Sequence, residues 1–162
     1  NAPKAPLVLS SSRNLFKLFM ADIGLLASIY ADGIQLKILD NEPSINFGAI
    51  YENVVAQELN AHGFQLYYYN NKRQGELDFV IEQNGNVLPL EVKSGKDYER
   101  HKALNNVMNS TTYNLPKAYV LCNDNVRQTG KVAYLPIYMT MFIKKEQQLP
   151  TNYKIDLTGL KP

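Results

Sequence analysis

The sequence predicts an α/β domain in which helices flank a mixed β-sheet. A helix with apolar residues at spacings of three and four precedes three strands, a polar helix and a further strand. An Asn-Gly pair joins two of the strands as a hairpin. The chain has 162 residues, of which 45% are hydrophobic and 20% charged, and this is enough for one domain with a substantial core.

The N-terminal region is expected to hold little regular structure. Residues 1–14 are rich in Pro and Ser, which favours a linker or an extended arm. The apolar run Leu15–Met20 favours a strand, and Asp22 can cap a helix that continues to about Tyr30. Residues 31–44 show no clean period, so we expect a loop with at most one strand.

The rest of the chain shows clearer patterns. Residues 46–61 form the most regular helix, and Gly63 is suited to end it in the left-handed conformation. The domain is expected to span 15–143, with 144–162 as a polar C-terminal tail. The remaining elements are expected as a strand at 64–69, a hairpin at 75–95, a helix at 98–109, strands at 117–122 and 132–135, and a last helix at 136–143.

Composition narrows the class of protein. A net charge of +2 and a pI of about 8.6 do not by themselves indicate nucleic-acid binding. The single cysteine, Cys122, excludes an internal disulfide and is expected to be a buried thiol, so the reducing cytoplasm is the expected location. No apolar stretch approaches the roughly 20 residues that span a bilayer, and no membrane partner is expected. Because the chain begins at Asn1 without Met, we expect a fragment of a longer protein.

The hairpin brings two acids together. With Asn84-Gly85 as its turn, the facing pairs are Phe79 with Leu90, Leu77 with Val92, Ile81 with Leu88, Glu76 with Lys93 and Asp78 with Glu91. The first three pairs form an apolar face and the last two a charged one. Opposed like charges are destabilising, so the two acids conflict. A divalent cation between them would turn repulsion into ligation, and hard oxygen donors suit Mg²⁺ or Mn²⁺.

Two further residues extend this candidate site. Lys93 lies on the charged face, where an ammonium can stabilise the negative charge of a phosphate. Glu52 lies on an apolar stripe of its helix, so a helix packed across the charged face would bring it near the acids. The alternative is that the charges form an ordinary solvated face. Val80 and Pro89 share that face and weaken this alternative.

These residues resemble the motif of the PD-(D/E)xK nuclease superfamily in order and spacing. The matching positions are a helical Glu52, then Asp78 in "GELDFVI", then Glu91-Val92-Lys93 on the next strand. The resemblance implies a restriction-endonuclease-like mixed sheet flanked by helices and Mg²⁺-dependent phosphodiester hydrolysis. It also implies that Asp78, Glu91 and the carbonyl of Val92 hold the metal, that Lys93 is the catalytic lysine, and that Glu52 is an auxiliary acid.

A closer resemblance covers roughly residues 15–143. The stretches "LFKLFMADIGLLASIY", "FGAIYENVVAQELNAHG", "LYYYNNKRQGELDFVIEQNGNVLPLEVKSG" and "YLPIYMTMFI" look like the domain of unknown function at the C-terminus of many prokaryotic AAA-type ATPases. This implies a preceding ATPase domain as partner, although the chain itself has no P-loop. We therefore expect a metal-dependent nuclease-like domain working with an ATPase. The alternative is a catalytically silent module for interaction or oligomerisation of the ATPase, and homo-oligomer formation stays open.

Several cations flank the proposed site along the chain. They are Lys72 and Arg73 before Asp78, and Lys96, Arg100 and Lys102 after Lys93. These side chains can bind the phosphate backbone of nucleic acid, or they can be the solvated charges usual in turns and helices. Both interpretations stay open.

The run of three tyrosines and the two histidines are expected to have structural rather than functional roles. Tyr67–Tyr69 could stack bases, but strands favour tyrosine, so we expect core packing. His101 is expected at the surface of a polar helix, and His62 at a helix end where it complements the dipole.

Overall fold

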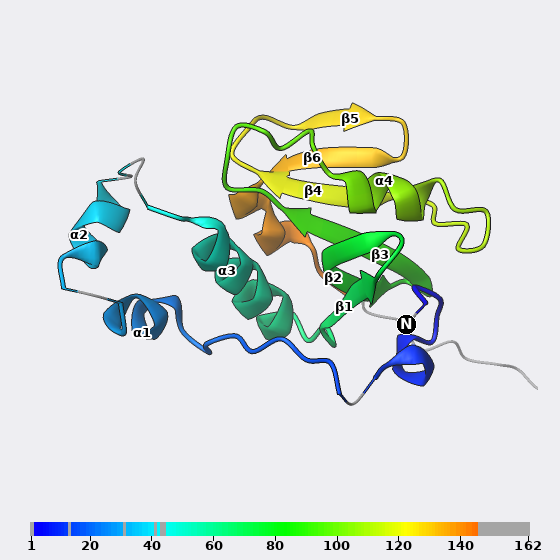
Figure 1. Ribbon diagram of the computed structural model, residues 1–162, viewed down its shortest axis with the longest axis horizontal. Coiled ribbons are helices and arrows are strands. Elements are labelled where there is room, and N and C mark those ends of the chain that lie inside the picture. Colours follow the sequence, from blue (N-terminus) through cyan, green and yellow to red (C-terminus); the bar gives the residue numbers. More distant parts are fainter. Residues whose placement is uncertain (1, 13, 31, 41, 43–44, 146–162) are drawn as a thin grey trace, which may run out of the picture.

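A six-stranded mixed β-sheet with helices on both faces forms the body of the protein (Figure 1). The computed structural model describes residues 2–12, 14–30, 32–40, 42 and 45–145. The strands are β1 (Tyr67–Asn71), β2 (Gly75–Gln83), β3 (Asn86–Val92), β4 (Ala118–Cys122), β5 (Arg127–Thr129) and β6 (Val132–Pro136). The helices are α1 (Ile23–Ser28), α2 (Ile34–Leu39), α3 (Gly48–Ala61) and α4 (Lys102–Met108), with 3₁₀ helices η1 (Leu7–Ser10) and η2 (Ile137–Phe142).

The strand order across the sheet is β1-β2-β3-β4-β6-β5. Strands β1, β2 and β3 form an antiparallel meander, whereas β4 runs parallel to both β3 and β6. Helix α4 lies in the connection between β3 and β4, as a parallel step requires a crossover. The predicted fold class is confirmed, and the arrangement is consistent with a restriction-endonuclease-like fold.

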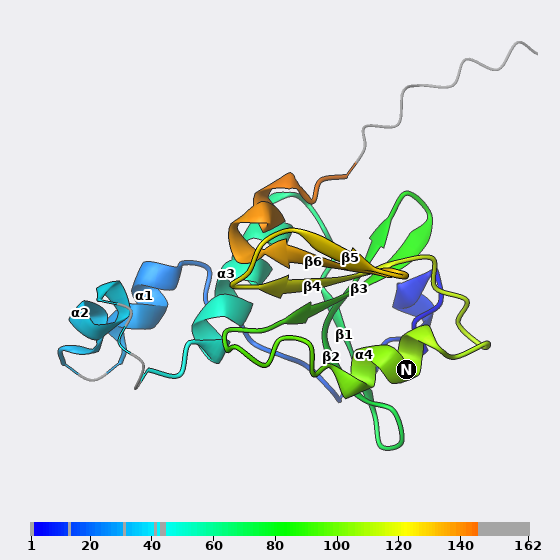
Figure 2. The same cartoon turned by 90° about the horizontal axis from the view of Figure 1, so that it is seen from above.

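Two apolar cores lie on opposite faces of the sheet. On one face, Leu59 of α3 packs with Phe79 and Leu90 of the hairpin. On the other face, Leu104 of α4 packs with Leu77. Seen from above in Figure 2, η2 lies on one side of β4 and β6 and α4 lies on the other. The sheet is thus covered on both faces, and polar side chains that reach its interior need partners.

The hairpin turn forms as the sequence predicts. Asn84 and Gly85 have φ angles of 52° and 74°, the positive values that a two-residue type I′ turn requires. The predicted register is confirmed through the pairs Phe79 with Leu90, Ile81 with Leu88 and Gln83 with Asn86.

The predicted separation of the hairpin faces is wrong at its open end, because β2 contains a β-bulge. Between Tyr67 and Tyr69, β1 advances by two residues while β2 advances by three, from Val80 to Leu77. Leu77 and Val80 consequently pack in the same core, against α4. The prediction placed Leu77 on the apolar face and Val80 on the charged one. The extra residue lies next to Asp78, and bulges of this kind redirect side chains.

The segment before α3 differs most from the prediction. Leu15–Met20 forms no strand, and the backbone of its last residue is hydrogen-bonded instead to the buried side-chain amide of Asn53 on α3. This amide accepts from the N–H of Met20 at 2.8 Å and donates to its C=O at 3.1 Å. Helix α2 stands where a loop or a strand was expected. Asp22 caps α1 as predicted.

Other boundaries shift by a few residues. Strand β1 begins at Tyr67 rather than Phe64, α4 begins at Lys102 rather than Tyr98, and β5 was not predicted. Within the predicted arm 1–14, Leu7 is only 4% exposed and belongs to the core on the α4 face. Most of the predicted tail lies outside the described residues. None of the helices in the described ranges is long and apolar enough to cross a membrane.

Candidate metal and phosphate site

Asp78 and Glu91 come together where β2 and β3 diverge. The antiparallel ladder ends at Phe79 paired with Leu90, so Asp78 and Glu91 do not face each other directly as predicted. Instead, the Asp78 carboxylate accepts the backbone N–H of Val92 at 2.7 Å. A side chain thus makes the hydrogen bond that a neighbouring strand would otherwise provide. This places the Asp78 carboxylate against the segment of β3 that carries Glu91.

The acids of the site are partly buried and electrostatically coupled. Burial raises the pKa of Asp78, and burial together with the charge of Asp78 raises the pKa of Glu52 and of Glu91. The Glu91 side chain is 8% exposed, and its Oε2 has no hydrogen-bond partner among the residues that the structure describes. One oxygen of this buried carboxylate is therefore left for a further donor or a cation to compensate. Glu52 lies on α3, as the sequence predicts.

Lys17 lies among these acids, and the sequence pattern did not predict it. Its Nζ is 2.7 Å from Oε1 of Glu76, 3.7 Å from Oε2 of Glu52 and 3.8 Å from Oδ1 of Asp78. The ammonium also lies 5.4 Å from the centre of the Tyr68 ring. Burial lowers the pKa of Lys17, but the Glu76 hydrogen bond and the acidic charges outweigh it and raise the pKa overall. The signal in the sequence is a lone cation inside the apolar run that begins at residue 15.

Lys93 is paired differently from the expectation. Its Nζ lies 2.7 Å from Oε1 of Glu91, whereas Glu76, the expected partner, binds Lys17. The backbone N–H of Lys93 donates to the C=O of Leu121 at 2.8 Å, which holds the end of the hairpin against β4. The ammonium is therefore positioned beside the most buried acid of the site.

The donor set fits a hard divalent cation only if that cation keeps several waters. Two carboxylates, Asp78 and Glu91, and the carbonyl of Val92 are oxygen donors of the kind that Mg²⁺ and Mn²⁺ prefer. Among the residues that the structure describes, no three His, Cys, Asp or Glu side chains are grouped closely enough to hold a metal. Lys17 fills the space beside Asp78, so a cation there has to compete with an ammonium.

The predicted phosphate-binding cations are exposed on two neighbouring segments. The β1–β2 turn and α4 are joined by a hydrogen bond of 3.1 Å from the Asn106 amide to the C=O of Gln74. Arg100 forms an ion pair with Asp97 at 3.7 Å. The exposed cations are Lys72 and Arg73 on the turn, Lys96 and Arg100 before α4, and Lys102 at its start.

His101 and two of the three consecutive tyrosines lie in surroundings that differ from those expected. His101 is not a surface residue but is 5% exposed, and its Nε2 hydrogen-bonds the hydroxyl of Tyr134 at 2.7 Å. Burial lowers the pKa of His101, which favours the neutral ring and makes it a poor phosphate ligand. Tyr69 is buried in the core as expected, but Tyr67 and Tyr68 are only half-buried. Cys122 is a buried free thiol, as predicted.

The fold and the family comparison define an α/β domain without an assigned activity. The chain belongs to the family described as Domain of unknown function (DUF4143), whose model matches residues 47–139. The match includes Glu52, Asp78, Glu91 and Lys93, whereas Lys17 lies before the first matched residue. Comparison with curated proteins and with solved structures gave no match to this chain.

Proposed function

We propose that this domain hydrolyses phosphodiester bonds of nucleic acid with a divalent cation, and that it works beside an ATPase domain. The observation that carries the proposal is the buried Glu91 carboxylate, which has one oxygen paired with Lys93 and the other without a partner in the described part of the chain. The ordered motif, with its likeness to PD-(D/E)xK nucleases, and the likeness to C-terminal domains of AAA-type ATPases support it.

Each side chain has a definite role in this proposal. Asp78, Glu91 and the carbonyl of Val92 would hold Mg²⁺ or Mn²⁺, and such a cation would supply polarisation of a phosphoryl oxygen and a lowered pKa of its bound water. Lys93 presents its ammonium to the negative charge that grows on the phosphate. Burial raises the pKa of Glu52, so this carboxylate is suited to accept a proton near the site.

A second function is favoured by a specific observation. Lys17 forms ion pairs with Glu52, Glu76 and Asp78, which we call the acidic cluster. The protein therefore partly neutralises this cluster with its own ammonium group. A catalytically silent module for interaction or oligomerisation of the ATPase would keep this arrangement permanently. The two functions therefore differ in whether a cation can displace the ammonium of Lys17.

Cleavage of plasmid DNA in Mn²⁺ tests the proposal, with Lys93→Ala compared with Lys117→Ala. Both changes remove one lysine charge, but Lys117 is exposed and its ammonium hydrogen-bonds Gln83 and Tyr119, outside the acidic cluster. We expect Lys93→Ala to slow cleavage by about 100-fold or more, because it removes a charge aimed at the phosphate. Lys117→Ala should stay within a few-fold of the wild type. Equal cleavage by the wild type and Lys93→Ala would reject the nuclease, and absence of both cleavage and Mn²⁺ binding would favour the silent module.

A further inference from the structure

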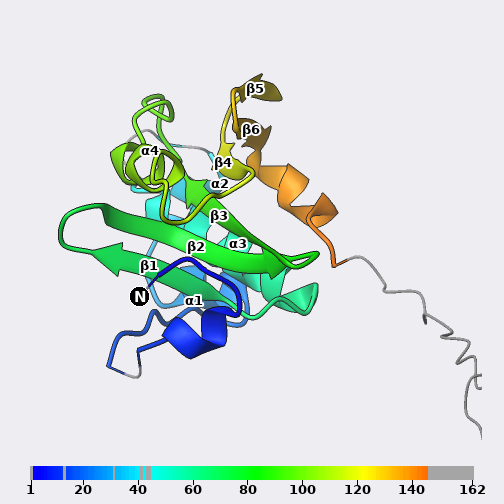
Figure 3. The same cartoon turned by 90° about the vertical axis from the view of Figure 1, so that its right-hand side faces the viewer.

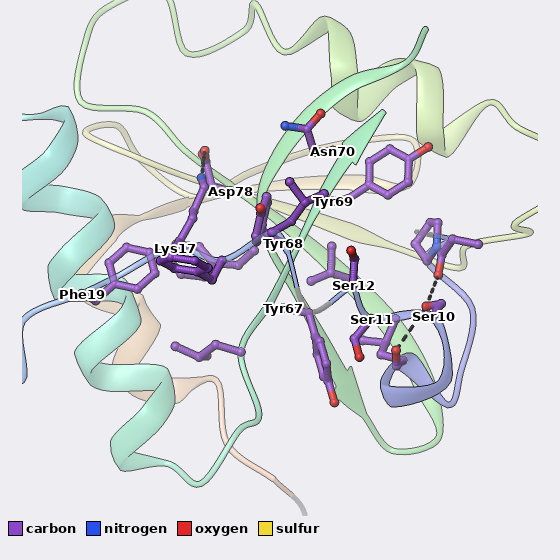
Figure 4. Close-up of a pocket in the computed structure, with 18 residues that line it drawn as sticks. Ser10, Ser11, Ser12, Lys17, Phe19, Tyr67, Tyr68, Tyr69, Asn70 and Asp78 are labelled. Atoms are coloured by element: carbon purple, nitrogen blue, oxygen red, sulfur yellow. Dashed lines mark hydrogen bonds and ion pairs between the residues drawn. The ribbon is translucent and has the colours of Figure 1, made fainter. Parts of the chain in front are cut away.

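A cavity of about 290 Å³ lies between the N-terminal segment and β1 (Figure 4). Residues of η1 and of the stretch around Lys17 form one wall, and residues of β1 and the middle of β2 form the other. Figure 3 shows the N-terminal segment passing β1, which is an edge strand of the sheet. Asp78 lines the cavity, so the cavity is continuous with the candidate site.

We propose that this cavity binds one unpaired nucleotide of a single-stranded nucleic acid, next to the phosphate held at the site. The inference rests on the proposed function and deepens it, because it names the class of substrate. Single strands, flaps and frayed ends offer such a nucleotide, whereas an intact duplex does not.

The cavity walls have the chemistry that recognises a nucleobase. The aromatic rings of Phe16, Tyr67 and Tyr68 line it, and the half-buried tyrosines leave ring surface accessible for stacking. The hydroxyl-bearing residues Ser11 and Ser12 lie near Tyr67 in Figure 4 and supply polar groups for the edge of a base. Flat apolar faces combined with polar edges match a base better than a wholly apolar ligand.

The size of the cavity selects a single nucleotide. A volume of about 290 Å³ lies at the lower limit of small-ligand sites, so it can enclose one base with its sugar but not a base pair. A base within a duplex must first leave its stack, which costs a few kcal/mol, whereas an unpaired base pays much less. Discrimination between single and double strands follows from this difference.

The charged side chains near the two ends of β1 are placed to bind the phosphates of a single-stranded nucleic acid. Lys17 and Asp78 line the same cavity, so a phosphate on the sugar of the bound nucleotide would lie close to the acidic cluster. A cation at Asp78 would free the ammonium of Lys17 to bind that phosphate. Lys72 and Arg73 follow β1 directly and are exposed, so they can bind phosphates farther along the strand.

Fluorescence anisotropy with labelled oligothymidylate, oligouridylate and a blunt DNA duplex tests the inference in Ca²⁺, another oxygen-binding cation. We expect at least one single strand to bind about tenfold or more tightly than the duplex, and comparison of the two single strands separates DNA from RNA. Tyr68→Ala should weaken single-strand binding by about 5- to 100-fold, the usual effect of losing one base stack. Ser12→Phe should weaken binding by filling the cavity without removing a tyrosine.

Tyr138→Ala is the matched control, because this tyrosine is 68% exposed on η2 and does not line the cavity. Thermal unfolding confirms that each variant is folded. Equal binding of duplex and single strands, no binding of any probe, or wild-type affinity in both Tyr68→Ala and Ser12→Phe would overturn the inference. Binding is measured without cleavage, so the two proposals can fail separately. If the protein shows this binding pattern but cleaves no nucleic acid, the nuclease proposal fails and the nucleotide-binding cavity stands. If the protein cleaves nucleic acid while both variants bind with wild-type affinity, the cavity proposal fails and the nuclease proposal stands.

Discussion

The carboxylate of Asp78 accepts the backbone N–H of Val92 at 2.7 Å, at the point where β2 and β3 diverge. This bond holds one proposed ligand against the strand that carries the other two. The bulge in β2 and the end of the β2–β3 ladder both occur next to this aspartate. A local irregularity of the sheet thus coincides with the candidate site, as is common for bulges.

Substitution of Asp78 separates the structural role of this side chain from its charge. Asp78→Asn keeps an acceptor for Val92, whereas Asp78→Ala leaves that N–H without a partner. We expect the Ala variant to have a free energy of unfolding about 1–3 kcal/mol below that of the Asn variant. Both should lose Mn²⁺ binding, because both lose the negative charge. Chemical denaturation and calorimetric titration measure the two effects, and an Asn variant with wild-type Mn²⁺ affinity would contradict the assigned role.

Removal of the Lys17 ammonium should tighten cation binding. A unit charge about 4 Å from a ligand oxygen costs a bound cation on the order of 1 kcal/mol even in water, and more at a buried site. Lys17→Met should therefore lower the Mn²⁺ dissociation constant at least about fivefold, measured by calorimetry. Lys96→Met removes the same charge outside the acidic cluster and should have little effect. Weaker binding in Lys17→Met would mean that Lys17 holds the acids in place and does not compete with the metal.

The raised pKa of Glu91 predicts how its replacement changes stability with pH. Burial, assisted by the charge of Asp78, raises this pKa in the folded protein. The folded state then binds the proton more strongly than the unfolded state, so Glu91 favours folding at low pH, and this contribution is lost as pH rises through the raised pKa. Without divalent cations, Glu91→Gln should unfold at a higher temperature than the wild type above that pKa. The difference should shrink towards acid pH, and a difference that grows in acid would contradict the assigned environment.

Asn53 should control the position of the segment that carries Lys17. Its buried amide makes two hydrogen bonds to the backbone of Met20, so Asn53→Ala should lower the free energy of unfolding by about 1–3 kcal/mol. Hydrogen exchange should become faster in residues 15–20. Asn60→Ala, at an exposed position of the same helix, is the matched control. Equal exchange in both variants would show that other contacts fix the segment.

Local rules account for the parts of the fold that could be predicted. The Asn84-Gly85 turn fixed the register of the hairpin, and the 3.6-residue period of α3 marked the helix that carries Glu52. Motif order then selected the acids and Lys93. The turn and the helix depend on residues close together in the chain, and the motif depends only on the order of residues, so the sequence alone contains all three.

Long-range contacts account for the parts that could not be predicted. The bulge beside Asp78 arises from pairing with β1, which no pattern within β2 encodes. Lys17 lies in a segment whose Met20 is hydrogen-bonded to Asn53, 33 residues farther along the chain, and no local pattern encodes this contact. Helix α2 has only six residues, IQLKIL, which is too short to show a clear helical period, so the sequence predicted a loop or a strand there.

A crystal structure of the protein grown with Mn²⁺, read by its anomalous signal, shows whether Asp78 and Glu91 hold a metal ion. We expect one peak bound by carboxylate oxygens of Asp78 and Glu91 and by the carbonyl of Val92, with the ammonium of Lys17 moved away from Asp78. A map with no peak there, and with Lys17 still paired to its three acids, would contradict the proposed metal site.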